Sequence, residues 1–150
     1  MEDRRGGSRH EKGDLEMKFL IVGSGGREHA LSWKLSQSPL VTQQFVAPGS
    51  DAIGLLDKTT SVPIAVDQID QLVEFAKKEQ IDLTVVGPEA PLVAGIVDRF
   101  QKEKLKVFGP SQAAAQLEGS KRFTKELLEE SKVPTAGYTV GTDPKEALKQ

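Results

Sequence analysis

The stretch Met17-Lys18-Phe19-Leu20-Ile21-Val22-Gly23-Ser24-Gly25-Gly26-Arg27-Glu28-His29-Ala30 decides the fold of this chain. A short apolar segment leads directly into three glycines and then into a sequence compatible with a helix. This order predicts a buried strand, a tight turn whose backbone N–H groups can cradle a phosphate, and the N-terminus of a helix.

The alternation of strand and helix continues through the chain. Strands are predicted at residues 19–22, 44–47, 61–66, 83–86 and 106–108, because these short runs are rich in apolar and β-branched residues. Helices are predicted between most of them, and the segment after Pro48, to about Lys58, is expected to be irregular. Alternating strands and helices imply a parallel sheet with right-handed crossovers. The predicted fold class is therefore α/β.

Several details of the helices can be predicted as well. The first helix is expected to turn an apolar stripe toward the sheet, formed by Ala30, Leu31, Trp33 and Leu35. Asp67 is suited to cap the helix that follows the third strand. Pro91 suits the first turn of a single helix that carries the apolar residues of the segment 92–100.

The pattern changes after Pro110. A short alanine-rich helix at 111–117 is followed by a helix that Ser120 can cap. The expected buried face of this second helix consists of Phe123, Leu127 and Leu128. Residues 138–140 are expected to open another strand, and Asp143 to cap a further helix.

Composition narrows the possible functions. The 150 residues include no cysteine and only two histidines, which excludes disulfides, thiolate metal sites and cysteine nucleophiles and disfavours histidine metal clusters. The net charge of −2 does not favour binding to nucleic acid or to a membrane surface. No apolar run approaches the roughly 20 residues that span a bilayer. We expect a cytoplasmic protein. The polar, charged leader at 1–16 is predicted to be disordered, either as a native extension or as a remnant of cloning.

Three predicted strands end at a glycine, at Gly23, Gly87 and Gly109. The carboxyl ends of parallel strands share one edge of the sheet, where ligands bind in folds of this class. Glycines in the first turn are also compatible with a tight turn of no further function. Arg27 directly after the turn favours phosphate binding, because its guanidinium pairs readily with phosphate.

Dinucleotide binding does not follow from this turn. The G-x-G-x-x-G/A pattern places glycine or alanine at its sixth position, where this chain has Glu28. An acidic residue that would bind a ribose diol is also missing, because Ala47 and Pro48 stand at the end of the second strand. A Walker loop is absent because no Gly-Lys-Ser/Thr follows the glycines.

Three further side chains are candidate functional residues, and each could instead have an ordinary structural or surface role. His29 could act as a base, although a capping or hydrogen-bonding role is commoner in the first turn of a helix. Glu89, between Pro88 and Pro91, could accept hydrogen bonds from sugar hydroxyls or an amine, or be a solvated loop residue. Lys121 could be an ordinary surface lysine.

Together these stretches resemble the phosphoribosylamine-glycine ligase family of ATP-grasp enzymes. The resemblance rests on the segments 23–30, 45–49, 82–92 and 108–125 and covers nearly all of residues 17–150. It implies a Rossmann-like pre-ATP-grasp domain at 17–110 and the beginning of an ATP-grasp domain at 111–150. It also implies a ligase of purine biosynthesis that joins glycine to 5-phosphoribosylamine with ATP and magnesium or manganese.

The resemblance further implies roles for individual residues. Gly23, Ser24, Gly25, Gly26 and Arg27 would surround the ribose phosphate. Pro48, Gly49, Gly87, Pro88 and Glu89 would shape the rest of the substrate site. Lys121 would approach the phosphates of ATP. In the family the magnesium-binding carboxylates and the ATP lid lie beyond residue 150, so we expect no catalytic or metal-binding residue within this chain and no turnover by it alone.

Two points remain open. The family usually has Gly-Asn-Ala-Gly after the proline matched by Pro48, whereas this chain has Gly49-Ser50-Asp51-Ala52, so the sugar contacts of this loop are undetermined. A non-catalytic nucleotide-binding module and an NAD-dependent oxidoreductase domain are the alternative functions. The sequence makes no prediction about the oligomeric state.

Overall fold

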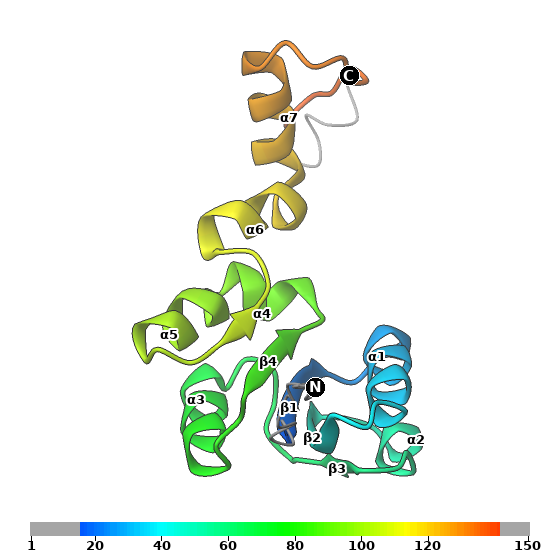
Figure 1. Ribbon diagram of the computed structural model, residues 1–150. Coiled ribbons are helices and arrows are strands. Elements are labelled where there is room, and N and C mark those ends of the chain that lie inside the picture. The colour runs from blue at the N-terminus through cyan, green and yellow to red at the C-terminus, as the bar shows by residue number, and fades with distance from the viewer. Residues whose placement is uncertain (1–15, 142–150) are drawn as a thin grey trace, which may run out of the picture.

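The computed structural model describes residues 16–141, which form a parallel five-stranded sheet with helices on both faces (Figure 1). The strand order is β3-β2-β1-β4-β5. The strands are β1 (Met17–Gly23), β2 (Val41–Pro48), β3 (Thr59–Ser61), β4 (Leu83–Val86) and β5 (Val107–Phe108). The helices are α1 (Gly26–Ser36), α2 (Asp51–Gly54), α3 (Ile69–Lys78), α4 (Glu89–Val93), α5 (Ile96–Lys102), α6 (Gln112–Gly119) and α7 (Lys121–Glu130). The predicted α/β fold with a parallel sheet is confirmed.

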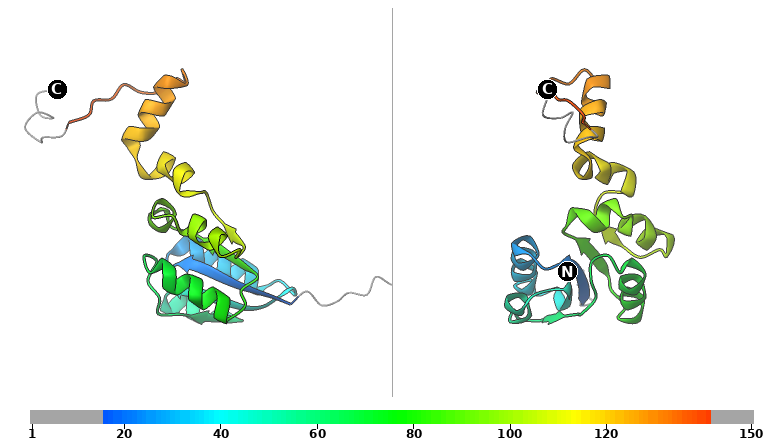
Figure 2. Two further views of the ribbon diagram at one scale, coloured as in Figure 1. Left: turned by 90° about the vertical axis from the view of Figure 1, so that its left-hand side faces the viewer. Right: turned by 180° about the vertical axis from the view of Figure 1, so that it is seen from behind.

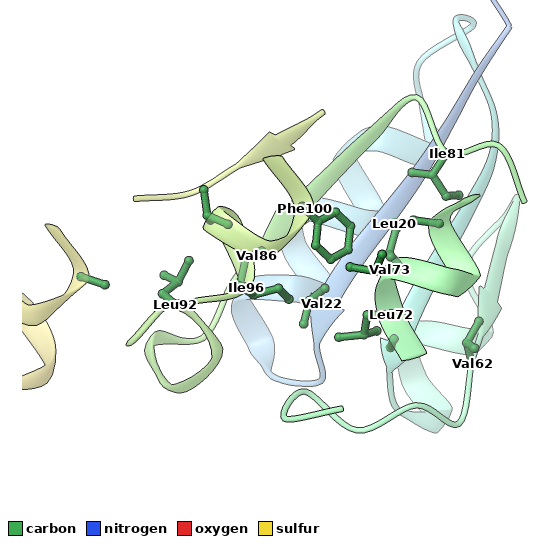
Figure 3. Close-up of a cluster of buried hydrophobic side chains, with 14 residues drawn as sticks. Leu20, Val22, Val62, Leu72, Val73, Ile81, Val86, Leu92, Ile96 and Phe100 are labelled. Carbon is green, nitrogen blue, oxygen red and sulfur yellow. The ribbon is translucent and has the colours of Figure 1, made fainter. Parts of the chain in front are cut away.

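The main hydrophobic core lies between the sheet and the helices α3, α4 and α5. Successive side chains of a strand point to opposite faces, so Leu20 and Val22 of β1 face this core. Phe100 of α5 is fully buried and lies beside Leu20 and Val73 (Figure 3). The largest fully buried side chain among residues 16–141 therefore joins α3 and α5 to the central strand.

The opposite face of the sheet is covered by α1 and α2. Its core is smaller and consists of Ile21, Val46 and Ile53, with Leu35 packed against them. The apolar stripe predicted for α1 is wrong in three of its four members, since Ala30, Leu31 and Trp33 are exposed.

Polar residues of α1 face the sheet instead of that stripe. Glu28 and Ser32 are its buried residues, and Leu35 continues the same helical face. The Ser32 carbonyl accepts a hydrogen bond of 2.9 Å from Nε2 of Gln44, which is fully buried in β2. These contacts set the rotation of α1 about its axis, which an apolar pattern alone could not predict.

The third strand was predicted too late in the chain. It spans Thr59–Ser61 and pairs with β2, so only the first residue of the predicted segment 61–66 is correct. The last ladder contact is the hydrogen bond from Val62 N to Val46 O, at 2.9 Å. The next N–H that would face β2 is that of Ile64, which donates to Val62 O at 2.7 Å instead, so the ladder ends there.

The segment predicted to be irregular contains the short helix α2. Ser50 caps it by accepting a hydrogen bond from Ile53 N at 3.4 Å. Ile53 is the single buried residue of the helix. One apolar residue in a single helical turn produces no period, so the pattern could not reveal this element.

Two predictions about the central helices are wrong. Gln68 rather than Asp67 precedes α3, and its Oε1 accepts a hydrogen bond from Ala65 N at 2.9 Å. The single helix predicted over 92–100 is two helices, α4 and α5. They are separated at Gly95, whose φ of 92° lies in the left-handed region and interrupts the helical hydrogen bonds.

The helices α6 and α7 extend away from the sheet (Figure 2). Ala115 of α6 belongs to the main core, whereas α7 has no buried residue. Ser120 caps α7 as predicted, with 3.2 Å from its Oγ to Phe123 N. The buried face predicted for α7 is wrong in this structure, because Phe123 and Leu127 are 42% and 37% exposed.

The last predictions concern the two ends of the chain. Residues 138–140 form no strand, since no neighbouring strand is present to pair with them in the part of the chain described. The predicted helix after Asp143 and nearly all of the predicted disordered leader lie outside the described residues. Among those residues, no helix is long and apolar enough to cross a membrane.

An ion-pair network on the surface joins α3 to α5. Glu103 accepts from Lys77 at 3.0 Å and from Arg99 at 2.6 Å, and Arg99 also contacts Asp70 at 2.8 Å. Hydrogen bonds from Lys77 and Arg99 hold the pKa of Glu103 below its usual value. The charged form of Glu103 is therefore favoured in the folded state.

The Glu103→Gln variant is expected to show a weaker loss of stability in acid. A carboxylate whose pKa is lowered by folding stabilises the protein above its unfolded-state pKa, and this contribution is lost as the pH falls through the folded-state pKa. The midpoints of thermal unfolding of the two proteins should differ at pH 7 and converge in strong acid. A difference that is independent of pH would contradict this role of Glu103.

Candidate functional site

The carboxyl edge of the sheet brings together three predicted segments. Gly23 is paired with Pro48 at the ends of β1 and β2, and Gly49 N donates to Gly23 O at 3.1 Å. On the other side of β1, Gly87 N donates to Val22 O at 3.1 Å. The segments 23–27, 48–49 and 87–89 therefore lie next to one another, although the first and the last are 60 or more residues apart in sequence.

Glu28 occupies the space between the ends of β1 and β4. Its side chain is 5% exposed, and Oε2 accepts a hydrogen bond from Gly25 N at 2.7 Å. A Cβ atom added to Gly87 would lie 1.8 Å from Glu28 Oε1, and one added to Gly23 would lie 2.6 Å from Glu28 Cγ. The absence of side chains at Gly23 and Gly87 therefore makes room for this carboxylate.

The sequence pattern does not indicate Glu28 as part of the site. Glu28 is a departure from the dinucleotide pattern, in which a small residue at this position allows the helix to approach the strand. In this protein the small residue of the contact between α1 and the sheet is Gly87, at the end of β4, and the large one is Glu28 on the helix. The sequence does contain one indication of this contact. Glu28 replaces the small residue of the dinucleotide pattern, and Gly87 follows the strand β4, which is paired with β1.

The glycine turn is less open than predicted. The backbone N–H groups of the turn are predicted to cradle a phosphate, but the N–H of Gly25 already donates to the Glu28 carboxylate at 2.7 Å. This contact is one of the two hydrogen bonds of a capping box. Gly26 is open, because no atom lies within 4 Å of the position that its Cβ would occupy. The accessible part of the turn is therefore the N-terminus of α1 at Gly26.

Arg27 is exposed and links the turn to β4. Its Nη1 donates a hydrogen bond to the carbonyl oxygen of Gly87. This contact holds the guanidinium at the carboxyl edge. A guanidinium has five N–H donors, so further donors remain for an anion.

Two hollows lie on the β2 side of the turn. One has a volume of about 260 Å³ and lies between the turn and the α2 loop; its lining residues are Ser24, Gly25, Gly26, His29, Ser50 and Ala52. The second, of about 650 Å³, lies between the α2 loop and β3 and includes Pro48, Gly49 and Ser50 in its lining. His29 is thus beside the candidate site, although no contact in the described structure marks it as a base.

Glu89 is on the same edge as the first residue of α4. Pro88 precedes it as the N-cap residue, with extended backbone. The Glu89 side chain is exposed, and none of the described residues donates a hydrogen bond to it. Its carboxylate is therefore available to solvent or to a ligand.

Lys121 is not brought to this edge. It is the first residue of α7, which contacts α6 and lies away from the sheet (Figure 1). It lines a separate hollow of about 370 Å³, together with Arg122, Lys125 and Tyr138. Lys125 in this group lies 5.7 Å from the Tyr138 ring and donates to Ala136 O at 2.7 Å.

The described residues do not suggest a metal centre. No group of three or more histidine, aspartate or glutamate side chains among residues 16–141 is placed to hold an ion.

Comparison with known sequences gives a consistent result. The family model described as "Phosphoribosylglycinamide synthetase, N domain" matches residues 17–118. A protein of Haemophilus influenzae named "Phosphoribosylamine--glycine ligase" is 55% identical over 132 residues, and one of Allochromatium vinosum with the same name is 58% identical over 132 residues. Each alignment covers 88% of this chain and 31% of the relative. The chain therefore spans about a third of the length of these relatives.

Solved structures show similar folds. A phosphoribosylamine-glycine ligase from Thermotoga maritima is 26% identical, with a TM-score of 0.60 over 89% of this chain and 29% of that one. The biotin carboxylase domain of Hydrogenobacter thermophilus 2-oxoglutarate carboxylase, in complex with ADP, magnesium and bicarbonate, has a TM-score of 0.63. It is 16% identical and covers 90% of this chain and 32% of its own, so this second likeness concerns the fold alone.

Proposed function

Because the chain belongs to the phosphoribosylglycinamide synthetase N-domain family, we propose that its carboxyl edge binds the ribose 5-phosphate portion of 5-phosphoribosylamine. The parent enzyme would join this amine to glycine with ATP, as a step of purine biosynthesis. The observation that carries the proposal is the mixed charge of the edge. The N-terminus of α1 and Arg27 favour an anion, while Glu28 and Glu89 offer carboxylate oxygens.

This arrangement suits a ligand with one anionic end and one end rich in hydrogen-bond donors. In 5-phosphoribosylamine the phosphate is anionic, and the sugar carries hydroxyls and an amine. We assign the phosphate to Gly26 and Arg27, with Gly23, Ser24 and Gly25 forming the turn beneath it. Pro48, Gly49, Gly87, Pro88 and Glu89 would surround the sugar.

The reaction proposed for the parent enzyme has two steps. ATP transfers its terminal phosphoryl group to the glycine carboxylate, giving glycyl phosphate and ADP. The amine nitrogen of 5-phosphoribosylamine then attacks the glycyl carbonyl carbon. The C–N bond forms, the bond between the carbonyl carbon and the phosphate oxygen breaks, and phosphate leaves with the proton that the amine loses. The contribution of this chain would be to hold the amine at a fixed position, which lowers the entropic barrier to attack.

No group of three or more histidine, aspartate or glutamate side chains placed to hold an ion is found among residues 16–141, and no step is assigned to a metal on this chain. For ATP, Lys121 is the residue proposed to approach the phosphates. We propose residues 17–110 as the pre-ATP-grasp domain and 111–150 as the beginning of the ATP-grasp domain. The 150-residue chain alone is therefore expected to bind the sugar phosphate but not to catalyse the ligation.

The Arg27→Gln variant is expected to bind ribose 5-phosphate about tenfold more weakly than the unchanged chain, because one charge-assisted contact is lost. Isothermal titration of the 150-residue chain with ribose 5-phosphate measures this difference. Arg122→Gln is the matched control, since Arg122 is on α7 and pairs with Glu126 at 2.7 Å. Equal affinities for all three proteins, or a response to NADH in place of ribose 5-phosphate, would contradict the proposal.

A further inference from the structure

Glu28 is a buried carboxylate that receives only one hydrogen bond from the described residues. Its side chain is 5% exposed, and its one hydrogen bond within residues 16–141 is the contact from Gly25 N to Oε2. No lysine, arginine or histidine of the described chain lies within salt-bridge distance of it. Buried carboxylates are normally paired or hydrogen-bonded at most of their lone pairs, because removing their charge from water is unfavourable.

The second oxygen, Oε1, accepts no hydrogen bond from any of the described residues. The fully enclosed polar side-chain atoms without a partner are Ser32 Oγ, Gln44 Oε1 and Thr84 Oγ1 among the described residues, and Glu28 Oε1 is not one of them. Oε1 lies directly over Gly87, where an added Cβ would be 1.8 Å away. The free acceptor is therefore placed at the carboxyl end of β4, on the edge proposed to bind the ligand.

The orientation of this carboxylate is fixed at Oε2, on the side of the glycine turn. The hydrogen bond from Gly25 holds Oε2 on the turn, and the neighbouring Arg27 is held by the Gly87 carbonyl. A ligand whose anion reaches Gly26 and Arg27 thus meets Glu28 on the β4 side of the same turn. A second anionic group would be repelled there, whereas a neutral donor would be attracted.

We propose that Glu28 binds the ligand directly and accepts a hydrogen bond from a sugar hydroxyl at Oε1. This inference rests on the proposed function, because it takes the bound molecule to be a pentose 5-phosphate. In this proposal Glu28 is the residue that makes a sugar phosphate bind more tightly than phosphate alone. Arg27 and the helix N-terminus attract both, and Glu28 favours only the ligand with hydroxyls.

The test compares ribose 5-phosphate with inorganic phosphate on the 150-residue chain and its Glu28→Gln variant. The variant is expected to bind ribose 5-phosphate about tenfold more weakly, because a hydrogen bond to a charged acceptor becomes a neutral one. Its affinity for inorganic phosphate should be unchanged or higher, because a nearby negative charge has been removed. Glu126→Gln, on the exposed surface of α7, is the matched control and should change neither affinity.

Two outcomes overturn the inference while leaving the proposed function intact. In one, the variant loses affinity for both ligands equally, which indicates that Glu28 only supports the turn. In the other, the variant binds both as the unchanged chain does. Failure of the unchanged chain to bind either ligand would overturn the proposed function itself.

A second measurement needs no variant and therefore does not depend on whether Glu28→Gln folds. The ¹³C resonance of the Glu28 carboxyl is expected to shift on addition of ribose 5-phosphate and to shift much less with inorganic phosphate. Equal shifts with the two ligands, or none with ribose 5-phosphate, would contradict direct contact with the sugar.

Discussion

Replacement of Gly87 by alanine is expected to lower the free energy of unfolding by about 2–3 kcal/mol, because the new methyl group would overlap the Glu28 carboxylate. The added Cβ would lie 1.8 Å from Oε1 and 2.7 Å from Cδ of Glu28. Either the glutamate must leave its buried position or the ends of β1 and β4 must move apart. Urea unfolding followed by circular dichroism measures the change.

Two further variants identify the cause. In a chain that already carries Glu28→Ala, the Gly87→Ala change should lower stability by less than about 1 kcal/mol, because the obstructing side chain is gone. Gly26→Ala adds the same methyl group where no atom lies within 4 Å, and alanine is the better helix former, so stability should be unchanged or slightly higher. Equal effects of Gly87→Ala with and without Glu28 would refute the placement of Glu28.

Phe100→Ala is expected to have the largest effect on stability, a loss of about 3–5 kcal/mol. Phe100 is fully buried in α5 and contacts both the central strand and α3 through the main core. Its truncation leaves a cavity that the surrounding strands and helices cannot close.

Phe108→Ala is the matched control for Phe100. It removes the same atoms at the end of β5, where the side chain is 70% exposed, and should lower stability by less than about 1 kcal/mol. Thermal and urea unfolding of the two variants would compare them under identical conditions. Similar losses for both would contradict the position assigned to Phe100 in the core.

The central strands could be predicted because their sequence pattern follows directly from burial. The run Phe19–Val22 is apolar throughout because helices cover both faces of β1, and β4 at Leu83–Val86 has the predicted bounds. Strand β3 could not be placed in this way. It is a short edge strand with exposed threonine and serine, and the apolar residues after it belong to the connection to α3.

The orientation of α1 shows why a hydrophobic pattern can mislead. Its buried face begins with Glu28, whose carboxylate finds space only because a residue 59 positions later is glycine. No window of sequence around α1 contains that information. Leu31 and Trp33 face outward as a result, and the polar contact between Ser32 and Gln44 takes the place expected for them.

The candidate site was predicted in its location more fully than in its chemistry. The glycine-ended strands place Gly23 and Gly87 on one edge, as parallel topology requires. The sequence could not indicate that the Gly25 N–H is occupied or that Arg27 contacts the Gly87 carbonyl, because both depend on side-chain conformation. Lys121 lies apart from this edge on α7, so its proposed role toward ATP does not depend on the turn.

We propose that the carboxyl edge around Gly26 and Arg27 binds a pentose 5-phosphate. The most direct test of this binding is an amide chemical-shift titration of the ¹⁵N-labelled 150-residue chain with ribose 5-phosphate. We predict saturable shifts at millimolar ligand that are largest at Ser24, Gly26, Arg27 and Gly87, with the amides of α7 unchanged. An unchanged spectrum at that concentration, or shifts confined to α7, would contradict the claim.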